Sequence, residues 1–115
     1  MKAILAMALA ILLTTSALAQ TSEQKTRIQE IQRASSIAYL DFCNHLAKED
    51  PTRSEEARFI SNISNYEMTI SFEGKGKYVV VFSPKIFRGE RFFGGVARYE
   101  IDANTGSILK FAMMK

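Results

Sequence analysis

The sequence predicts one α+β domain in which a long helix packs on a four-stranded antiparallel meander sheet. Three observations predict this fold class. Apolar residues recur with helical spacing before Pro51, the period changes to two from Tyr66 onward, and glycine-containing turns divide the rest of the chain into hairpins. A helical segment followed by a run of strands is typical of α+β domains.

The first 19 residues have the pattern of a cleaved export signal. Lys2 supplies a positive charge, residues 3–13 form an unbroken apolar run, and Ala17 and Ala19 give the small-x-small pattern that a signal peptidase recognises. The run covers 11 residues, whereas a membrane-spanning helix needs about 20. We expect cleavage after Ala19, a single domain over residues 20–115, a periplasmic or secreted location and no stable membrane insertion after signal removal.

The long helix is expected to begin at Thr21 and to end near Lys48. Thr21 and Gln24 have the spacing of a capping box, and Pro51 stops the helix. The chain has one cysteine, Cys43, which is either a small buried residue or an intermolecular thiol, so dimerisation stays open. The side chains expected on the sheet-facing side of the helix are Ile28, Ile31, Ser35, Ala38, Tyr39, Phe42 and Leu46, with Leu40, Cys43 and Ala47 at its margins.

A short helix is expected after the long one. Asp50 and Pro51 fit a helix start, and the helix would carry Phe59, Ile60 and Ile63 inward.

Four strands follow. Alternation from Tyr66 to Glu73 predicts a strand with one buried face, and the continuous apolar run in residues 77–83 predicts a central strand that is apolar on both faces. Residues 96–102 alternate again, and residues 107–113 form the last strand. Turns are expected at Gly74-Lys75-Gly76 and over residues 102–106, where Gly106 is able to take a positive φ.

The residue types that catalysis and metal binding require are scarce. The chain has one His and one Cys, whereas zinc needs three or four nitrogen or sulfur ligands. Asp41 lies four residues before His45 and can orient its imidazole, but Cys43 points to nearly the opposite side of the helix. No glycine-rich phosphate-binding motif is present. We expect no enzyme activity, cofactor or metal; polar groups converging around His45 would favour an enzyme.

Basic residues are concentrated in the sheet half of the chain. Residues 20–73 carry 6 basic and 9 acidic side chains, net −3, whereas residues 74–115 carry 8 and 3, net +5. They are either a surface for an acidic partner or solubilising charge on the open face of the sheet. A small net charge on an exported protein disfavours nucleic acid as the partner. The basic residues expected to form such a surface are Lys75, Lys77, Lys85, Arg88, Arg91, Arg98 and Lys110.

Residues 84–95, PKIFRGERFFGG, are the strongest candidate interaction site. Phenylalanine and arginine are favoured interface anchors, because a rigid ring buries a large area and a guanidinium binds carboxylates in a bidentate manner. Two interpretations stay open and are compatible: some of the rings pack on the helix, and others face a partner. The candidate partner-binding residues are Lys85, Phe87, Arg88, Arg91, Phe92 and Phe93.

The C-terminal third resembles the end of the NTF2-fold immunity protein family. The resemblance rests on the aromatic-valine strand Tyr78 to Phe82, the Gly94-Gly95 pair that begins the next strand, and the Ile-Asp-x-x-Thr-Gly-x-Ile turn from Ile101 to Ile108. The same turn is similar to the one that closes PepSY and other cystatin-like domains. The resemblance implies a cystatin-like or NTF2-like form for the α+β domain. It also implies a non-enzymatic protein that binds and neutralises a toxin or a peptidase, and it carries over no functional residue.

We therefore expect an exported bacterial protein-binding module, of inhibitor or immunity type, that neutralises a toxin or hydrolase by stoichiometric binding to an acidic surface. The alternative is a small-ligand or cell-envelope binding module that uses the concave face of the sheet. A cavity lined by Tyr66, Met68, Tyr99 and Phe111 would favour this alternative.

Overall fold

The structure, a computed structural model, describes residues 2–92 and 94–114, with side chains from residue 22 onward. The chain forms two compact units, Met1–Glu30 and Ile31–Lys115. Helix α1 (Lys2–Leu46) supplies the described part of the first unit and the first element of the second. Because α1 continues through Thr21 in this chain, the predicted helix start at that residue is wrong. The sequence offers no Pro or Gly to interrupt the helix there, and its Ala- and Leu-rich start favours helix.

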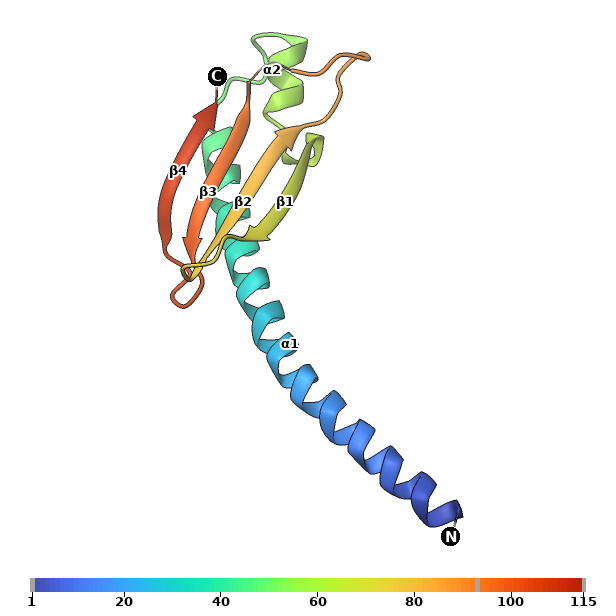
Figure 1. The fold of residues 1–115 in the computed structure, drawn as a ribbon. Coiled ribbons are helices and arrows are strands. Elements are labelled where there is room, and N and C mark those ends of the chain that lie inside the picture. The colour runs from blue at the N-terminus through green and yellow to red at the C-terminus, as the bar shows by residue number, and fades with distance from the viewer. Residues whose placement is uncertain (1, 93, 115) are drawn as a thin grey trace. The chain divides into compact units, whose positions relative to one another are not determined.

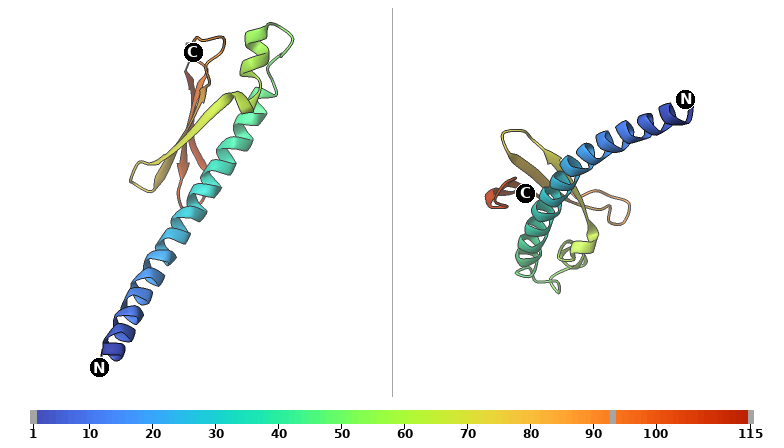
Figure 2. Two further views of the ribbon diagram at one scale, coloured as in Figure 1. Left: turned by 90° about the vertical axis from the view of Figure 1, so that its right-hand side faces the viewer. Right: turned by 90° about the horizontal axis from the view of Figure 1, so that it is seen from below.

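The second unit has two layers, as the sequence predicts: the C-terminal part of α1 packs against a four-stranded antiparallel sheet (Figures 1 and 2). The strands follow one another as a meander in the order β1-β2-β3-β4. This arrangement confirms the predicted α+β fold class. The strand bounds are β1 Tyr66–Phe72, β2 Lys77–Pro84, β3 Val96–Asp102 and β4 Ile108–Met114.

The core lies between α1 and the sheet. On α1 the buried side chains recur every four residues: Ala34, Ala38, Phe42 and Leu46. The two alanines are small, so the helix backbone approaches the sheet closely, and Phe42 fills the space beyond them. Its ring stacks on Phe82 at 4.7 Å and meets Tyr66 edge-on at 4.9 Å. The sheet residues buried in this core are Tyr66, Tyr78, Val80, Phe82, Ala97, Tyr99 and Ile101.

The strand register assigns the two faces of the sheet. Val80 lies opposite Tyr99, and Tyr78 lies opposite Ile101, so their side chains share the face covered by α1. Val79 lies opposite Glu100 on the other face, where β2 is apolar and β3 is charged. The predicted central strand, apolar on both faces, is therefore confirmed in β2, in which Val79 and Val80 are both buried.

Helix α2 (Glu55–Ile60) begins at Ser54, whose hydroxyl accepts a 3.0 Å hydrogen bond from the Ala57 N–H. The prediction that Asp50 and Pro51 begin this helix is wrong. The Asp50 carboxylate instead accepts hydrogen bonds from the backbone N–H and the hydroxyl of Thr52, at 2.9 and 2.6 Å, which forms a local turn. A 3₁₀ turn, η1 (Ile63–Asn65), then leads directly into β1.

The turn between β3 and β4 is held against α1. Asp102 Oδ1 accepts hydrogen bonds from the N–H groups of Asn104 and Thr105, and Gly106 has φ +76°, as predicted for this turn. The Arg33 guanidinium donates to the Ala103 carbonyl. These contacts fix the end of the sheet to the helix.

Candidate functional site

The predicted interaction segment forms a loop between β2 and β3 that ends in a tight hairpin. Phe87 and Glu90 exchange backbone hydrogen bonds, with N···O distances of 2.9 and 3.1 Å. Arg88 and Gly89 between them have φ values of 52° and 78°, the positive values that a type I′ turn requires. The turn therefore holds the backbone of Arg88 in a defined conformation at the tip of the loop.

Three phenylalanines join this loop to α2. The ring of Phe59 lies 4.8 Å from Phe87 and 5.5 Å from Phe92, and the latter two rings are 5.8 Å apart. All three side chains are half-buried. Phe87 and Phe92 therefore pack on a helix, as one interpretation of the sequence expected, but the helix is α2. Phe93 lies outside the described residues.

Charged groups surround the three rings. Arg88 forms an ion pair with Glu55 of α2, and its guanidinium carbon lies 5.1 Å from the centre of the Phe87 ring. The Lys85 ammonium donates a 3.1 Å hydrogen bond to the Ser64 carbonyl. Arg58 and Arg91 have no ion-pair partner among the described residues, and both are exposed. Two arginines at this end thus remain available for carboxylates from outside.

A surface hollow of about 360 Å³ lies between α2 and the loop. Phe59 and Phe87 form its apolar part. Its polar lining comes from Glu55, Arg58, Asn62, Asn65 and Arg88. We call Phe59, Phe87 and Phe92, with Lys85, Arg58, Arg88 and Arg91, the hairpin-end surface. Phe59 and Arg58 were not among the residues predicted for this site; their only sequence signal was an aromatic residue within a polar segment.

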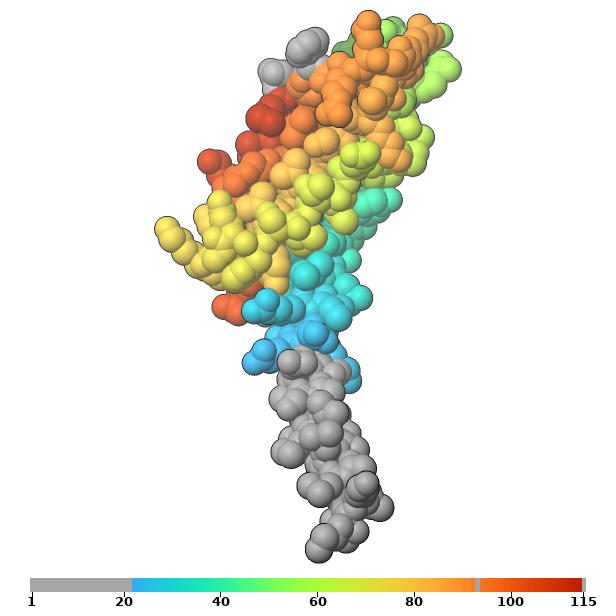
Figure 3. All heavy atoms as spheres, turned by 45° about the vertical axis from the view of Figure 1, so that its right-hand side comes forward, coloured from blue at the N-terminus to red at the C-terminus, as the bar shows by residue number. Residues whose placement is uncertain are grey.

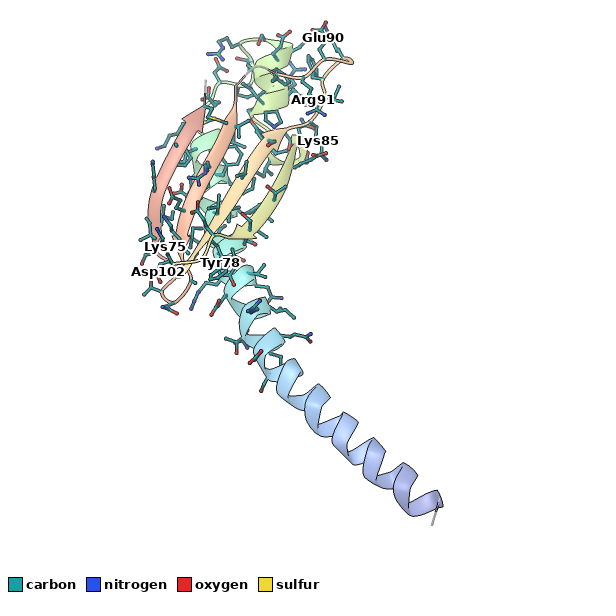
Figure 4. All side chains as sticks on the ribbon, viewed as in Figure 1. Lys75, Tyr78, Lys85, Glu90, Arg91 and Asp102 are labelled. Atoms are coloured by element: carbon teal, nitrogen blue, oxygen red, sulfur yellow. The ribbon has the colours of Figure 1, made fainter. Side chains whose placement is uncertain are left out.

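The seven basic residues expected to form a surface for an acidic partner do not gather in one place. Lys75 lies at the turn between β1 and β2, whereas Lys85 and Arg91 lie at the opposite end of the sheet (Figure 4). Lys77 and Arg98 lie on the face of the sheet opposite α1, where acidic side chains of the same sheet bind them. Only Lys85, Arg88 and Arg91 accompany the phenylalanines.

The charges on that open face form a network around Glu100. Its two carboxylate oxygens accept hydrogen bonds from Lys77 at 2.6 Å and from Arg98 at 2.9 Å, and Glu73 lies 3.8 and 3.7 Å from the same two cations. The hydrogen bond from Lys77, followed by that from Arg98, lowers the pKa of Glu100, and the bond to Glu100 raises the pKa of Lys77. This network holds sheet residues together instead of facing a partner.

Asp41 does contact the imidazole of His45, as its spacing predicted, with 3.3 Å between Oδ2 and Nε2. The same carboxylate oxygen accepts a 2.8 Å hydrogen bond from the buried hydroxyl of Tyr99. Burial, and then this bond, raise the pKa of Tyr99. The other side of the imidazole stacks on Phe111 at 4.4 Å. These contacts satisfy a buried hydroxyl and cover an aromatic ring, and they bring no nucleophile to His45 among the described residues.

Two of the four residues named for a concave-face cavity are packed inside the core. Tyr66 is 8% exposed and Tyr99 is fully buried, and the rings of Phe42 and Phe82 occupy the space next to them. The Tyr66 hydroxyl donates a 2.6 Å hydrogen bond to the Ile60 carbonyl. These two tyrosines are thus part of the core.

In the described part of the chain, no three His, Cys, Asp or Glu side chains lie close enough together to hold a metal ion. None of the described helical residues makes a stretch with the length and hydropathy that crossing a bilayer requires. Comparison of the chain with family models, curated proteins and solved structures gives no match.

Proposed function

We propose that the protein is an exported bacterial binding module that neutralises a toxin or hydrolase by stoichiometric binding through the hairpin-end surface. The observation that carries the proposal is the combination of three half-buried phenylalanines with exposed arginines in the hairpin-end surface of the second unit. Aromatic and arginine side chains are enriched where protein interfaces gain most of their binding energy. The site therefore suits a protein partner better than a substrate.

The proposed partner has an acidic surface. Arg58 and Arg91 are exposed, without an ion-pair partner among the described residues, and Arg88 is held by Glu55 and by the hairpin turn. A preorganised guanidinium loses little conformational entropy on binding a carboxylate. Carboxylates placed over the hollow would bind these arginines, while apolar side chains of the partner cover the exposed parts of the rings.

Export to the periplasm or medium belongs to the same proposal. The pattern of residues 1–19 supports it, and a neutralising protein placed there would meet effectors that arrive from outside the cell. The resemblance of the C-terminal third to the NTF2-fold immunity protein family supports the same class of function.

Affinity capture with charge-reversed variants tests this proposal. The protein, expressed from its full sequence, is used to capture proteins from envelope and secreted fractions, and bound proteins are identified by mass spectrometry. The test variant carries Arg58→Glu with Arg91→Glu. The control variant carries Lys75→Glu with Lys110→Glu, which makes the same charge change away from the hairpin-end surface.

We expect one stoichiometric protein that the wild type and the control retain and that the test variant loses, because reversed charges repel an acidic partner. Its toxic or hydrolytic activity should fall to the background level at a one-to-one ratio. Equal retention by both variants contradicts the proposed surface. Retention of no protein favours the alternative, a small-ligand or envelope-binding module.

A further inference from the structure

The free edge of β1 presents unpaired backbone groups. β1 is the first strand of the sheet and pairs only with β2. At one end of this strand pair the Glu73 N–H donates a hydrogen bond to the Lys77 carbonyl, and at the other end the Lys85 N–H donates to the Asn65 carbonyl. Glu73 and Asn65 are therefore both bonded to the β2 side. Since bonded pairs alternate in an antiparallel ladder, odd-numbered residues of β1 bond to β2, and the N–H and C=O groups of Met68 and Ile70 point to the outer edge.

The N–H of Tyr66 follows the same alternation, because it points away from β2 and donates to the Ile63 carbonyl. Beyond it, Met68 and Ile70 continue the edge as a template for another strand. An edge strand with unpaired N–H and C=O groups is able to pair with an extended chain.

An apolar groove of about 400 Å³ runs beside this edge, between α1 and β1. It is lined by Ser35, Ser36, Tyr39 and Leu40 of the helix and by Met68 of the strand. Leu40 is 63% exposed, and Tyr39 and Met68 are each 44% exposed. Figure 3 shows atoms of β1, in yellow-green, next to those of α1, in teal. Apolar side chains thus remain uncovered where a fifth strand would place its own.

The two features fit one occupant. Residues directly opposite each other in an antiparallel pair place their side chains on the same face. A residue bonded to Met68 or Ile70 would therefore direct its side chain into the groove, against Leu40 and Tyr39. We propose that this groove binds an extended peptide segment of a partner protein, which adds to β1 as a fifth strand.

The negative charge of Glu67 favours basic side chains on the other face of the bound segment. Glu67 lies on the side of β1 away from α1, and it is exposed with no ion-pair partner among the described residues. Side chains of the added strand next to Glu67 are best matched by Lys or Arg. The bound segment therefore alternates apolar residues, which enter the groove, with basic or polar residues.

A second copy of this chain is a poorer occupant. Full-length antiparallel pairing of two β1 strands is centred on Thr69 and places Ser71 of one copy opposite Glu67 of the other, so a second copy offers Glu67 no cation. Pairing of β1 with β4 of another copy leaves a further pair of edges free, so copies would add head to tail beyond a dimer.

Selection of peptides from a random ten-residue library displayed on phage tests this inference with the protein expressed from its full sequence. The test variant is Leu40→Gln, and the matched control is Leu109→Gln, which makes the same change at a leucine that is 56% exposed on the opposite edge strand, β4. Both side chains are exposed, so neither change should unfold the protein. The groove shares no residue with the hairpin-end surface, so each result is independent of the other.

We expect the selected peptides to alternate apolar and basic residues and to bind Leu40→Gln about tenfold more weakly than wild type or the control. N-methylation of alternate peptide amides should abolish binding, because strand addition needs the backbone donors. Binding should slow hydrogen exchange at the Met68 and Ile70 amides. No enriched peptide, equal binding to Leu40→Gln, protection only on β4, or self-association through β1 would each overturn the proposal.

Discussion

The Tyr99 hydroxyl donates a hydrogen bond of 2.8 Å to the carboxylate of Asp41. Tyr99 is fully buried on β3, whereas the Asp41 side chain on α1 is 36% exposed. The buried hydroxyl therefore has a hydrogen-bond partner at the surface of the domain. His45 approaches the same oxygen from one turn along the helix. The bond therefore ties the two layers together.

Removal of this hydroxyl should destabilise the fold. We expect Tyr99→Phe to lower the free energy of unfolding by about 1 kcal/mol, the usual net contribution of one hydrogen bond. Urea denaturation measures the change, and Tyr39→Phe, at an exposed tyrosine of α1, is the control. An equal effect of the two substitutions would show that the bond to Asp41 contributes no stability.

Alkaline pH should weaken the fold through Tyr66. Burial, with a smaller contribution from Glu49, raises the pKa of Tyr66 to about 12. Its neutral form is therefore favoured in the folded state, and this stability is fully present below the unfolded pKa of about 10 and is lost as the pH rises through the folded value. Thermal unfolding between pH 9 and 12, in rough steps of one unit, should show a falling midpoint. Tyr66→Phe should make the fall shallower.

Acid should weaken the network around Glu100. Hydrogen bonds from Lys77 and Arg98 lower the pKa of Glu100 in the folded state. The stabilisation is present above the unfolded pKa of about 4.3 and is lost as the pH falls through the depressed folded value. Urea denaturation should show a fall in stability across this window that is shallower in Glu100→Gln. Because salt screens exposed charges, the fall should also be shallower at about 1 M salt; an unchanged slope in the variant would contradict the role of Glu100.

Processing of the N-terminus is checked by mass. If residues 1–19 are an export signal, protein recovered from the periplasm or medium begins at Gln20. Intact-mass spectrometry distinguishes this form from the full chain. Ala19→Leu places a large side chain at the recognised position and should leave the precursor uncleaved, whereas Ala10→Leu, within the apolar run, should be processed as wild type.

The periodic parts of the chain were predictable because each repeats one physical requirement. Alternation identified β3 to the residue, Val96–Asp102, since every second side chain is buried there. The turn at Gly106 was predictable because its backbone needs a positive φ. Periodicity alone did not determine which helix residues are buried: Tyr39 and Leu40 were expected near the sheet, but α1 turns them toward the uncovered edge of β1.

The candidate site was harder to predict because its contacts join distant segments. The sequence indicated Phe87 and Phe92 from their unusual place in a loop, but nothing local indicated that Phe59 of α2 packs against both rings. Likewise, Lys77 and Arg98 appeared as available positive charge until the strand register placed Glu100 beside both. Pairings of this kind depend on tertiary structure.

Close packing of the β3–β4 turn on α1 leads to a substitution with an internal control. A Cβ atom added at Gly106 would lie 2.7 Å from Ile37 Cδ1 and 3.1 Å from Arg33 Cδ, whereas one added at Gly74 meets nothing within 4 Å. Both glycines have φ +76°. Gly74→Ala therefore reports the backbone strain alone, about 1 kcal/mol, and Gly106→Ala adds the steric conflict.

We expect Gly106→Ala to lower the free energy of unfolding by about 2–4 kcal/mol, roughly 1–3 kcal/mol more than Gly74→Ala, because the turn must move away from the helix. Urea denaturation of both variants gives the difference. That movement would also stretch the hydrogen bond from Arg33 to the Ala103 carbonyl, so a further Arg33→Met change should cost less in Gly106→Ala than in wild type. Equal stability of the two alanine variants would show that the turn does not press on α1.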